Sequence, residues 1–377
     1  MAGLYIHIPF CSQFCIYCDF YSTKQTSRMD SFVEALLCEI NLKKDFFKNL
    51  EVPVTTIYFG GGTPSLLSTD QLSRIVNTAA ENFGISPESV GEFTIEVNPD
   101  DVTPAYLSGI REIGFNRLSM GVQSFSDQDL RWMNRRHSSS QAIEAFRNAR
   151  AAGFDNISLD FIFGYEMLTI NGWRSNLKKI IELRPEHISS YQLSIEPKSK
   201  LGRMYEKGCY NATSQELSYN EYTLLQQMLK EAGYNQYEIS NFALPGREAR
   251  HNSAYWNLYP YLGLGPSAHS FDGDYRWWNC SNLNNYIIQT SSGKDCSKKE
   301  KLSQKDKFNE TVMLSLRKTE GLDLNLLRDR FDTNLYDEFD KQLTTLAAGS
   351  VVLNNHKIII PPEKLFLSDG IVRDLFI

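Results

Sequence analysis

Three of the seven cysteines in this chain stand close together, in the stretch CSQFCIYCDFYS at residues 11–22. The C-x3-C-x2-C spacing of Cys11, Cys15 and Cys18 is open to three interpretations. A disulfide is disfavoured because the cysteine count is odd and the N-terminus lacks the pattern of a secretory signal. A structural zinc ion takes four ligands, and His7 is the nearest candidate for the fourth. A [4Fe–4S] cluster normally takes four thiolates, so three would leave one iron open for a small molecule.

Polar side chains also mark the ends of several apolar runs. After the run VTTIYF comes GGGTPS (residues 60–65), whose three glycines would let the backbone and its N–H groups approach a ligand closely. The side chains at or after four successive runs are Thr63, Glu96, Gln123 and Asp160. Because chemistry in parallel α/β folds sits at the carboxyl ends of strands, we expect these groups to lie beside the cysteines.

The elements that must position these residues alternate along the first 240 residues. The expected strands are residues 4–8, 54–59, 92–97, 117–120, 157–163 and 187–195. A capping box, Ser68 with Gln71, starts one helix, and Thr213 with Glu216 starts another. This β/α alternation predicts a parallel sheet, open or closed into a barrel.

Composition excludes several classes of protein. The 377 residues are 42% hydrophobic and 22% charged, which suits one large globular domain and a smaller one. The formal net charge of −6, without a dense basic stripe, argues against a nucleic-acid partner. No apolar run approaches 18 residues, so no transmembrane helix is expected, and without a signal peptide we expect a cytoplasmic protein.

A longer series of blocks, YIHIPFC…YFGGGTPS…IEVNP…GVQSF…NRRH…LDFIFG, resembles the oxygen-independent coproporphyrinogen III oxidase-like family of radical S-adenosylmethionine (SAM) proteins across residues 3–270. The resemblance implies a partial (β/α)6 radical SAM barrel. It also implies that Cys11, Cys15 and Cys18 hold a [4Fe–4S] cluster whose open iron is chelated by SAM. The implied cofactor-binding residues, with Tyr5 beside the cluster, are Tyr5, Gly61, Gly62, Thr63, Glu96, Gln123, Arg135 and Asp160. The chain departs from the family pattern at Tyr165 and Glu166, after Gly164, so the shape of that loop is left open.

The family has an oxidase branch and a heme chaperone branch, and three observations favour the chaperone. Phe20 stands where the oxidase branch carries a fourth cysteine, and the chain begins almost on its first strand, where the oxidase has a further N-terminal segment. RHNSAYW, residues 250–256, contains the motif that the chaperone branch associates with heme. We therefore expect a protein that binds heme, hands it to an acceptor protein and does not oxidise coproporphyrinogen III. A radical SAM enzyme acting on a porphyrinogen is the alternative.

The heme motif gives specific candidate residues. His251 would bind heme iron, while Tyr255 and Trp256 would cover the macrocycle and contact its propionates. His269 is the second candidate for the iron ligand.

Three regions are expected along the chain: a barrel (1–240), a connecting segment with the heme motif (241–290) and a helical, winged-helix-like domain (291–377). The Lys-rich run at 291–307 reads as a solvated linker, or as a weak contact with an anionic membrane surface. Cys296 is expected to be an exposed thiol, and VVLNNHKIII a hairpin turning on Asn354 and Asn355. The oligomeric state is left open, with a homodimer as one outcome.

Overall fold

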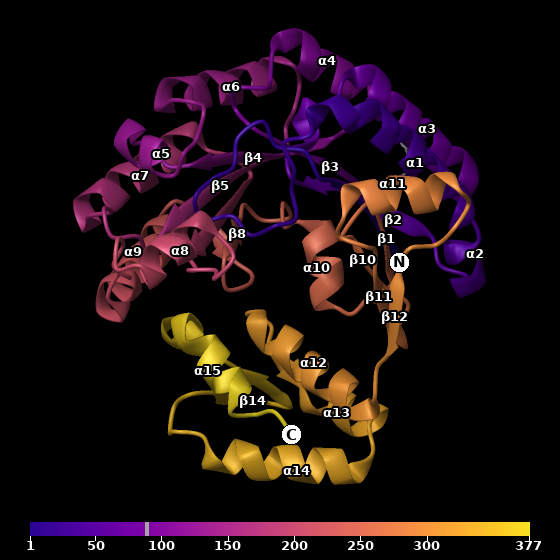
Figure 1. The fold of residues 1–377 in the computed structure, drawn as a ribbon. Coiled ribbons are helices and arrows are strands. Elements are labelled where there is room, and N and C mark those ends of the chain that lie inside the picture. Colours follow the sequence, from indigo (N-terminus) through magenta and orange to yellow (C-terminus); the bar gives the residue numbers. More distant parts are fainter. Residues whose placement is uncertain (87–89) are drawn as a thin grey trace.

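The structure, a computed structural model, describes residues 1–86 and 90–377, and one curved sheet organises most of them (Figure 1). Six parallel strands form its centre in chain order: β1 (Ala2–Ile8), β2 (Val54–Gly61), β3 (Glu92–Val97), β4 (Arg117–Gln123), β5 (Ile157–Phe163) and β6 (His187–Gln192). On β1, Leu4, Ile6 and Ile8 are fully buried, while Tyr5 and His7 point to the opposite face, as the two-residue period of a strand requires.

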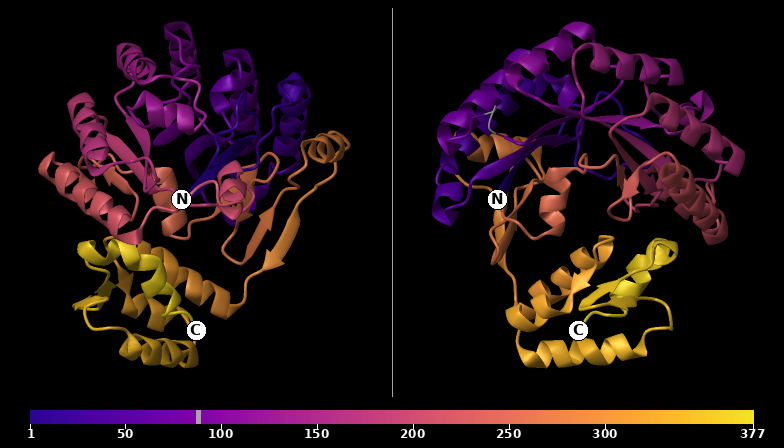
Figure 2. Two further views of the ribbon diagram at one scale, coloured as in Figure 1. Left: turned by 60° about the vertical axis from the view of Figure 1, so that its left-hand side comes forward. Right: turned by 180° about the vertical axis from the view of Figure 1, so that it is seen from behind.

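Helices cover one face of this sheet and leave the other concave (Figures 1 and 2). The long outer helices are α1 (Met29–Leu42), α3 (Thr69–Phe83), α4 (Pro104–Ile113), α6 (Ser139–Ala151), α7 (Ile170–Leu183) and α9 (Gln215–Glu231). The capping box of Ser68 and Gln71 is present, which confirms the predicted start of α3. The predicted start of α9 is wrong by one residue: Ser214, not Thr213, is the cap, because its side chain accepts the N–H of Leu217.

The sheet continues beyond the six central strands on both sides. Past β6, β8 (Asn241–Ala243) pairs antiparallel with β6, and β7 (Asn235–Gln236) pairs antiparallel with β8. On the other side, β9 (Tyr261–Leu264) is parallel to β1, and β10 (His269–Phe271), β11 (Tyr275–Trp278) and β12 (Lys298–Lys301) follow in antiparallel order. The order runs from β12 at one edge to β7 at the other, so this is the open, partial barrel that the sequence predicts.

The predicted connecting segment, residues 241–290, contributes β8 to β11 to this sheet. The predicted linker at 291–307 contains β12, an exposed edge strand of sequence KKEK. Shorter helices complete this part of the molecule: α2 (Phe46–Leu50), α5 (Asp127–Trp132), α8 (Lys200–Glu206), α10 (Arg250–Trp256) and α11 (Leu283–Ser291).

The C-terminal elements form a small unit on the concave side of the sheet (Figure 2). They are α12 (Gln304–Arg317), β13 (Leu322–Asp323), α13 (Leu324–Arg330), α14 (Thr333–Thr345), β14 (Val352–Asn354), β15 (Lys357–Ile359) and α15 (Ser368–Arg373). β14 and β15 pair antiparallel, which confirms the predicted hairpin, but the turn residues are Asn355 (φ 55°) and His356, one position later than predicted. None of the described helices is long and apolar enough to cross a lipid bilayer.

Candidate functional site

The three clustered cysteines lie on one loop between β1 and α1, and all three line a cavity of about 1040 Å³ inside the barrel. Backbone bonds close the base of this loop, from Cys11 N–H to the Thr23 carbonyl (2.9 Å) and from Thr23 N–H to the Pro9 carbonyl (2.6 Å). Burial raises the pKa of the Cys11 thiol, and raises that of Cys18 to about 12. Without a metal these two thiols are therefore neutral at pH 7, and binding irons would release their protons.

Arg135 places a guanidinium group beside the cysteine loop. Its Nη1 donates to Cys15 Sγ at 3.4 Å, and its Nη2 donates to Asn98 Oδ1 and to the Gly121 carbonyl, each at 2.6 Å. The Nε of Arg135 is buried without a partner among the described residues. An unused guanidinium donor next to the thiols suits a ligand that carries a carboxylate, as SAM does. Asn98 was not among the predicted site residues, although it stands in the IEVNP block of the sequence.

The glycine-rich turn after β2 lies against the cysteine loop. Gly61 has a φ of +109°, and a Cβ there would stand 2.5 Å from the His7 ring, so only glycine fits. The N–H of Gly61 donates to Glu96 Oε2 (3.1 Å) and that of Gly62 to the Ile8 carbonyl (2.8 Å). Both glycines line the cavity, and the fold already uses these two N–H groups in hydrogen bonds. Thr63 lines the cavity, and its Oγ1 contacts Cys11 Sγ at 3.6 Å.

Two buried carboxylates line the same cavity. Tyr58 donates its hydroxyl to Glu96 Oε1 at 2.8 Å, and Ser119 donates to both oxygens of Asp160 at 3.2 and 3.0 Å. Burial raises the pKa of Glu96 to about 7 and raises that of Asp160. These groups can accept hydrogen bonds from ribose hydroxyls or pair with an ammonium group when they are ionised.

Gln123 and Tyr5 complete the predicted SAM set, and the structure places them differently. Gln123 lines the cavity with a φ of 69°, directly after an irregular register between β4 and β5. Tyr5 is not among the described residues that line the cavity; its hydroxyl bonds to His7 Nδ1 at 3.0 Å. His7 Nε2 in turn bonds to the Tyr21 carbonyl at 3.0 Å, so Tyr5 reaches the cysteine loop only through His7.

His251, on α10, is 1% exposed and is not among the described residues that line the cavity. Its Nδ1 bonds to Thr56 Oγ1 and its Nε2 to the Tyr255 hydroxyl, each at 2.8 Å, and its ring stacks on Tyr58 at 5.1 Å and 23°. Burial lowers the pKa of His251 to about 3, so the ring is neutral. Both ring nitrogens are therefore occupied, and His251 can bind iron only if one of these hydrogen bonds opens.

The other two residues of the motif are also held by protein neighbours. The Tyr255 ring contacts Tyr261 edge to face at 4.6 Å, and the Arg317 guanidinium lies over the Trp256 ring at 4.8 Å. Asn252 is the residue of this helix that lines the cavity. The structure thus brings the motif close to the SAM-site residues through Tyr58, but does not present its imidazole to solvent.

The atypical loop after Gly164 is tightly packed. Tyr165 is fully buried, stacks on Trp132 at 5.4 Å and donates its hydroxyl to Asp129 Oδ2 at 2.6 Å. Glu166 accepts from Asn211 Nδ2 at 3.0 Å. These contacts explain how Tyr165 and Glu166 are accommodated, and neither residue is among the described residues that line the cavity.

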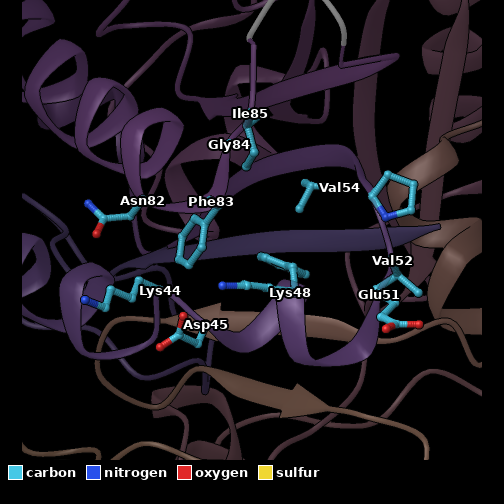
Figure 3. Close-up of a pocket in the computed structure, with 12 residues that line it drawn as sticks. Lys44, Asp45, Lys48, Glu51, Val52, Val54, Asn82, Phe83, Gly84 and Ile85 are labelled. Carbon is cyan, nitrogen blue, oxygen red and sulfur yellow. The ribbon is translucent and has the colours of Figure 1, made fainter.

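Two further features lie away from this site. Cys296 is half-buried, with its sulfur 2.7 Å from that of Cys280, so the expectation of an exposed thiol is wrong. A second hollow, of about 810 Å³, is lined by residues that include Lys48, Asn82 and Phe83 (Figure 3). It contains Val54, the first residue of β2, and therefore lies at the end of that strand remote from the cysteines.

The residues that line the main cavity fit a [4Fe–4S] cluster and SAM. Three thiols of one loop, a buried guanidinium with a free donor and two carboxylates share a cavity whose volume matches that of small-molecule sites. Among the described residues, no three His, Cys, Asp or Glu side chains are arranged to hold a single metal ion. When bound, the cluster and SAM would supply one-electron radical chemistry. The protein's part is to hold SAM at its carboxylate and its hydroxyls and to shield the site from water.

Two family profiles and several known proteins match this chain. The sequence profile of the Radical SAM superfamily matches residues 5–180, and that of the HemN C-terminal domain matches residues 302–365. The heme chaperone HemW of Lactococcus lactis is 32% identical over 96% of this chain and 93% of its own length. The heme chaperone HemW of Bacillus subtilis is 33% identical over 95% of this chain and 94% of its own. The solved structure of coproporphyrinogen III oxidase (HemN) from Escherichia coli superposes with a TM-score of 0.85 at 26% identity, covering 100% of this chain and 90% of that one.

Proposed function

The chain belongs to the HemW family of heme chaperones within the radical SAM proteins, and we propose that it binds heme and passes it to an acceptor protein. The observation that carries the proposal is similarity to heme chaperones over nearly the whole length of both chains. As a radical SAM protein it also carries a [4Fe–4S] cluster and SAM. We assign the cluster to Cys11, Cys15 and Cys18, which share the wall of one cavity.

The second candidate function is a radical SAM reaction on a porphyrinogen. The close superposition on coproporphyrinogen III oxidase favours it, as do the predicted SAM-site residues that line the cavity. Against it stands Phe20, which is 71% exposed at the position where the oxidase branch is expected to carry a further cysteine. The chaperone remains the better-supported function.

Heme transfer from the reconstituted protein tests the proposal directly. The anaerobic, cluster-loaded chain is mixed with hemin, freed of excess, and added to apomyoglobin, which serves as a spectroscopic probe of transfer. We expect the myoglobin Soret band to develop while 5′-deoxyadenosine stays at background. If no heme is bound or transferred, and a porphyrinogen is instead consumed with release of 5′-deoxyadenosine, the protein is a radical SAM enzyme and the proposed chaperone function is wrong.

We also propose a cytoplasmic location, with β12 as a peripheral contact for anionic membranes. The exposed lysines of this edge strand, Lys298, Lys299 and Lys301, support such a contact. Flotation with phosphatidylserine vesicles and with neutral vesicles tests it, since only the anionic vesicles should retain the protein, and only at low salt. A homodimer is a separate proposal, which sedimentation equilibrium over a range of concentrations would decide.

A further inference from the structure

Three side chains form a row across the strands that extend the sheet. His269 on β10 lies directly opposite Trp278 on β11, and Trp278 lies directly opposite Lys298 on β12. Directly opposed residues of antiparallel strands point to the same face of a sheet. The imidazole and indole rings are 6.0 Å apart and 26° from parallel. An imidazole, a large aromatic ring and an ammonium group therefore follow one another on one surface.

This row lies on the concave face of the sheet. The neighbouring Trp277 points the other way, is 7% exposed and packs against Phe46 of the outer helix α2. Lys299 also lies on that outer face, because its ammonium group stands over the Trp277 ring at 5.1 Å. On the concave side the row begins two strands from β1, which leads into the cysteine loop, because β9 pairs with both β1 and β10.

His269 differs from the other histidines in its freedom to bind a ligand. Among the chain's six histidines, His7, His137, His187 and His251 are buried, at 0–5% exposure, and each is hydrogen-bonded through its ring. His356 is exposed but stands 3.3 Å from Asp323 in the C-terminal sheet. His269 is exposed, and within the described residues neither of its ring nitrogens has a hydrogen-bond partner.

We propose that heme docks on this row, with His269 as the iron ligand, Trp278 against the macrocycle and Lys298 paired with a propionate. The inference rests on the proposed function and adds the place where the cargo binds. A neutral imidazole is a common axial ligand of heme iron, and partial desolvation of this exposed side chain, together with the nearby Arg276, lowers the pKa of His269 from its usual value. The indole adds apolar contact area, and an ammonium group pairs with a carboxylate.

The row is separate from the cavity that holds the cysteines. None of the three residues is among the described residues that line that cavity. At its other end the concave face is closed by α12, since Arg276 of β11 pairs with Glu310 at 2.7 Å. Heme on the row would therefore leave the SAM site free, and we expect both ligands to bind at the same time.

Titration of the full-length, cluster-loaded protein with hemin tests the iron ligand. We expect His269→Ala to weaken hemin binding by about tenfold or more and to shift the Soret band, while His356→Ala, an exposed histidine elsewhere, leaves both unchanged. Binding of iron-free protoporphyrin IX should be the same in wild type and His269→Ala, because it lacks the coordinated metal. Free imidazole should restore the wild-type Soret band in His269→Gly, an effect that a merely structural role would not produce.

Two neighbouring lysines on opposite faces of β12, Lys298 and Lys299, provide a test of the propionate contact and its control. Lys298→Ala should weaken binding of hemin but not of hemin dimethyl ester, whereas Lys299→Ala, on the outer face, should affect neither. If the wild-type protein binds no hemin, the proposed function fails and this site fails with it. If wild type binds hemin and His269→Ala binds it equally, with the same Soret band, the function stands and this site is wrong.

Discussion

Replacing His251 with alanine should destabilise the whole fold, whether or not this residue binds heme. The substitution leaves the Thr56 and Tyr255 hydroxyls without their buried partner, at about 1–3 kcal/mol for each unsatisfied group. It also removes the stack on Tyr58, worth about 0.5–1.5 kcal/mol. The low ends of these ranges add to about 2.5 kcal/mol, and the cavity left by the imidazole adds about 1.5 kcal/mol. We therefore expect the free energy of unfolding to fall by about 4 kcal/mol at pH 7.

The stability difference between wild type and His251→Ala should be smaller in acid, because the pKa of His251 is lowered in the folded protein. The folded protein keeps His251 neutral down to about pH 3, whereas the unfolded chain protonates it near pH 6.5. The native histidine therefore stabilises the fold above pH 6.5, and that contribution is lost as the pH falls toward 3. At pH 5 the wild type has lost about 2 kcal/mol through this residue, so the gap to His251→Ala should narrow from about 4 to about 2 kcal/mol.

Urea unfolding at pH 7 and pH 5, monitored by circular dichroism, measures the difference in unfolding free energy between wild type and His251→Ala at each pH. Tyr255→Phe is the matched control: it removes one hydroxyl, keeps the ring, and should cost about 1–2 kcal/mol. The prediction is wrong if His251→Ala unfolds with a free energy within about 1 kcal/mol of wild type at pH 7, or if the difference between the two proteins grows in acid. Loss of heme binding in this variant is evidence for iron ligation only when the folded fraction is matched to wild type.

Three further predictions concern the cluster and SAM. Replacing any one of Cys11, Cys15 or Cys18 with alanine should abolish the absorbance of the reconstituted [4Fe–4S] cluster, whereas Cys38→Ala should keep it; the reverse pattern would contradict the assignment. SAM binding, measured by calorimetry, should weaken as the pH falls below about 7, by up to about tenfold per unit, because Glu96 becomes protonated; Glu96→Gln should show no such dependence. Anaerobic assays with SAM and a reductant should yield no protoporphyrinogen IX from coproporphyrinogen III, and multiple turnovers would favour the enzyme reading.

The central sheet was predictable because its strands are apolar runs with clear limits. The bounds of β3 and β5 coincide with the predicted 92–97 and 157–163. Parallel pairing then brings their carboxyl ends together, so Glu96 and Asp160 could be placed in one site without knowledge of their contacts.

The extension of the sheet was not predictable from local pattern. β10 and β11 have three and four residues, too few to show a period, and their pairing depends on contacts that the local sequence does not encode. β12 reads KKEK because lysines protect an exposed edge from pairing with other chains, and this composition is the same as that of a solvated linker. For the same reason the row of His269, Trp278 and Lys298 is visible only in the folded chain.

The His-Asn-x-x-Tyr-Trp motif shows why composition alone could not settle the iron ligand. A histidine between aromatic residues suits heme, but it equally suits a buried ring held by two hydroxyls, and the structure shows the second arrangement. His251 stacks on Tyr58, and Tyr58 donates to Glu96, which also accepts the N–H of Gly61. Through this chain of contacts the motif positions a carboxylate of the SAM site. A change at His251 should therefore alter SAM affinity in the folded protein, whereas a change at His269 should alter hemin affinity and leave SAM affinity unchanged.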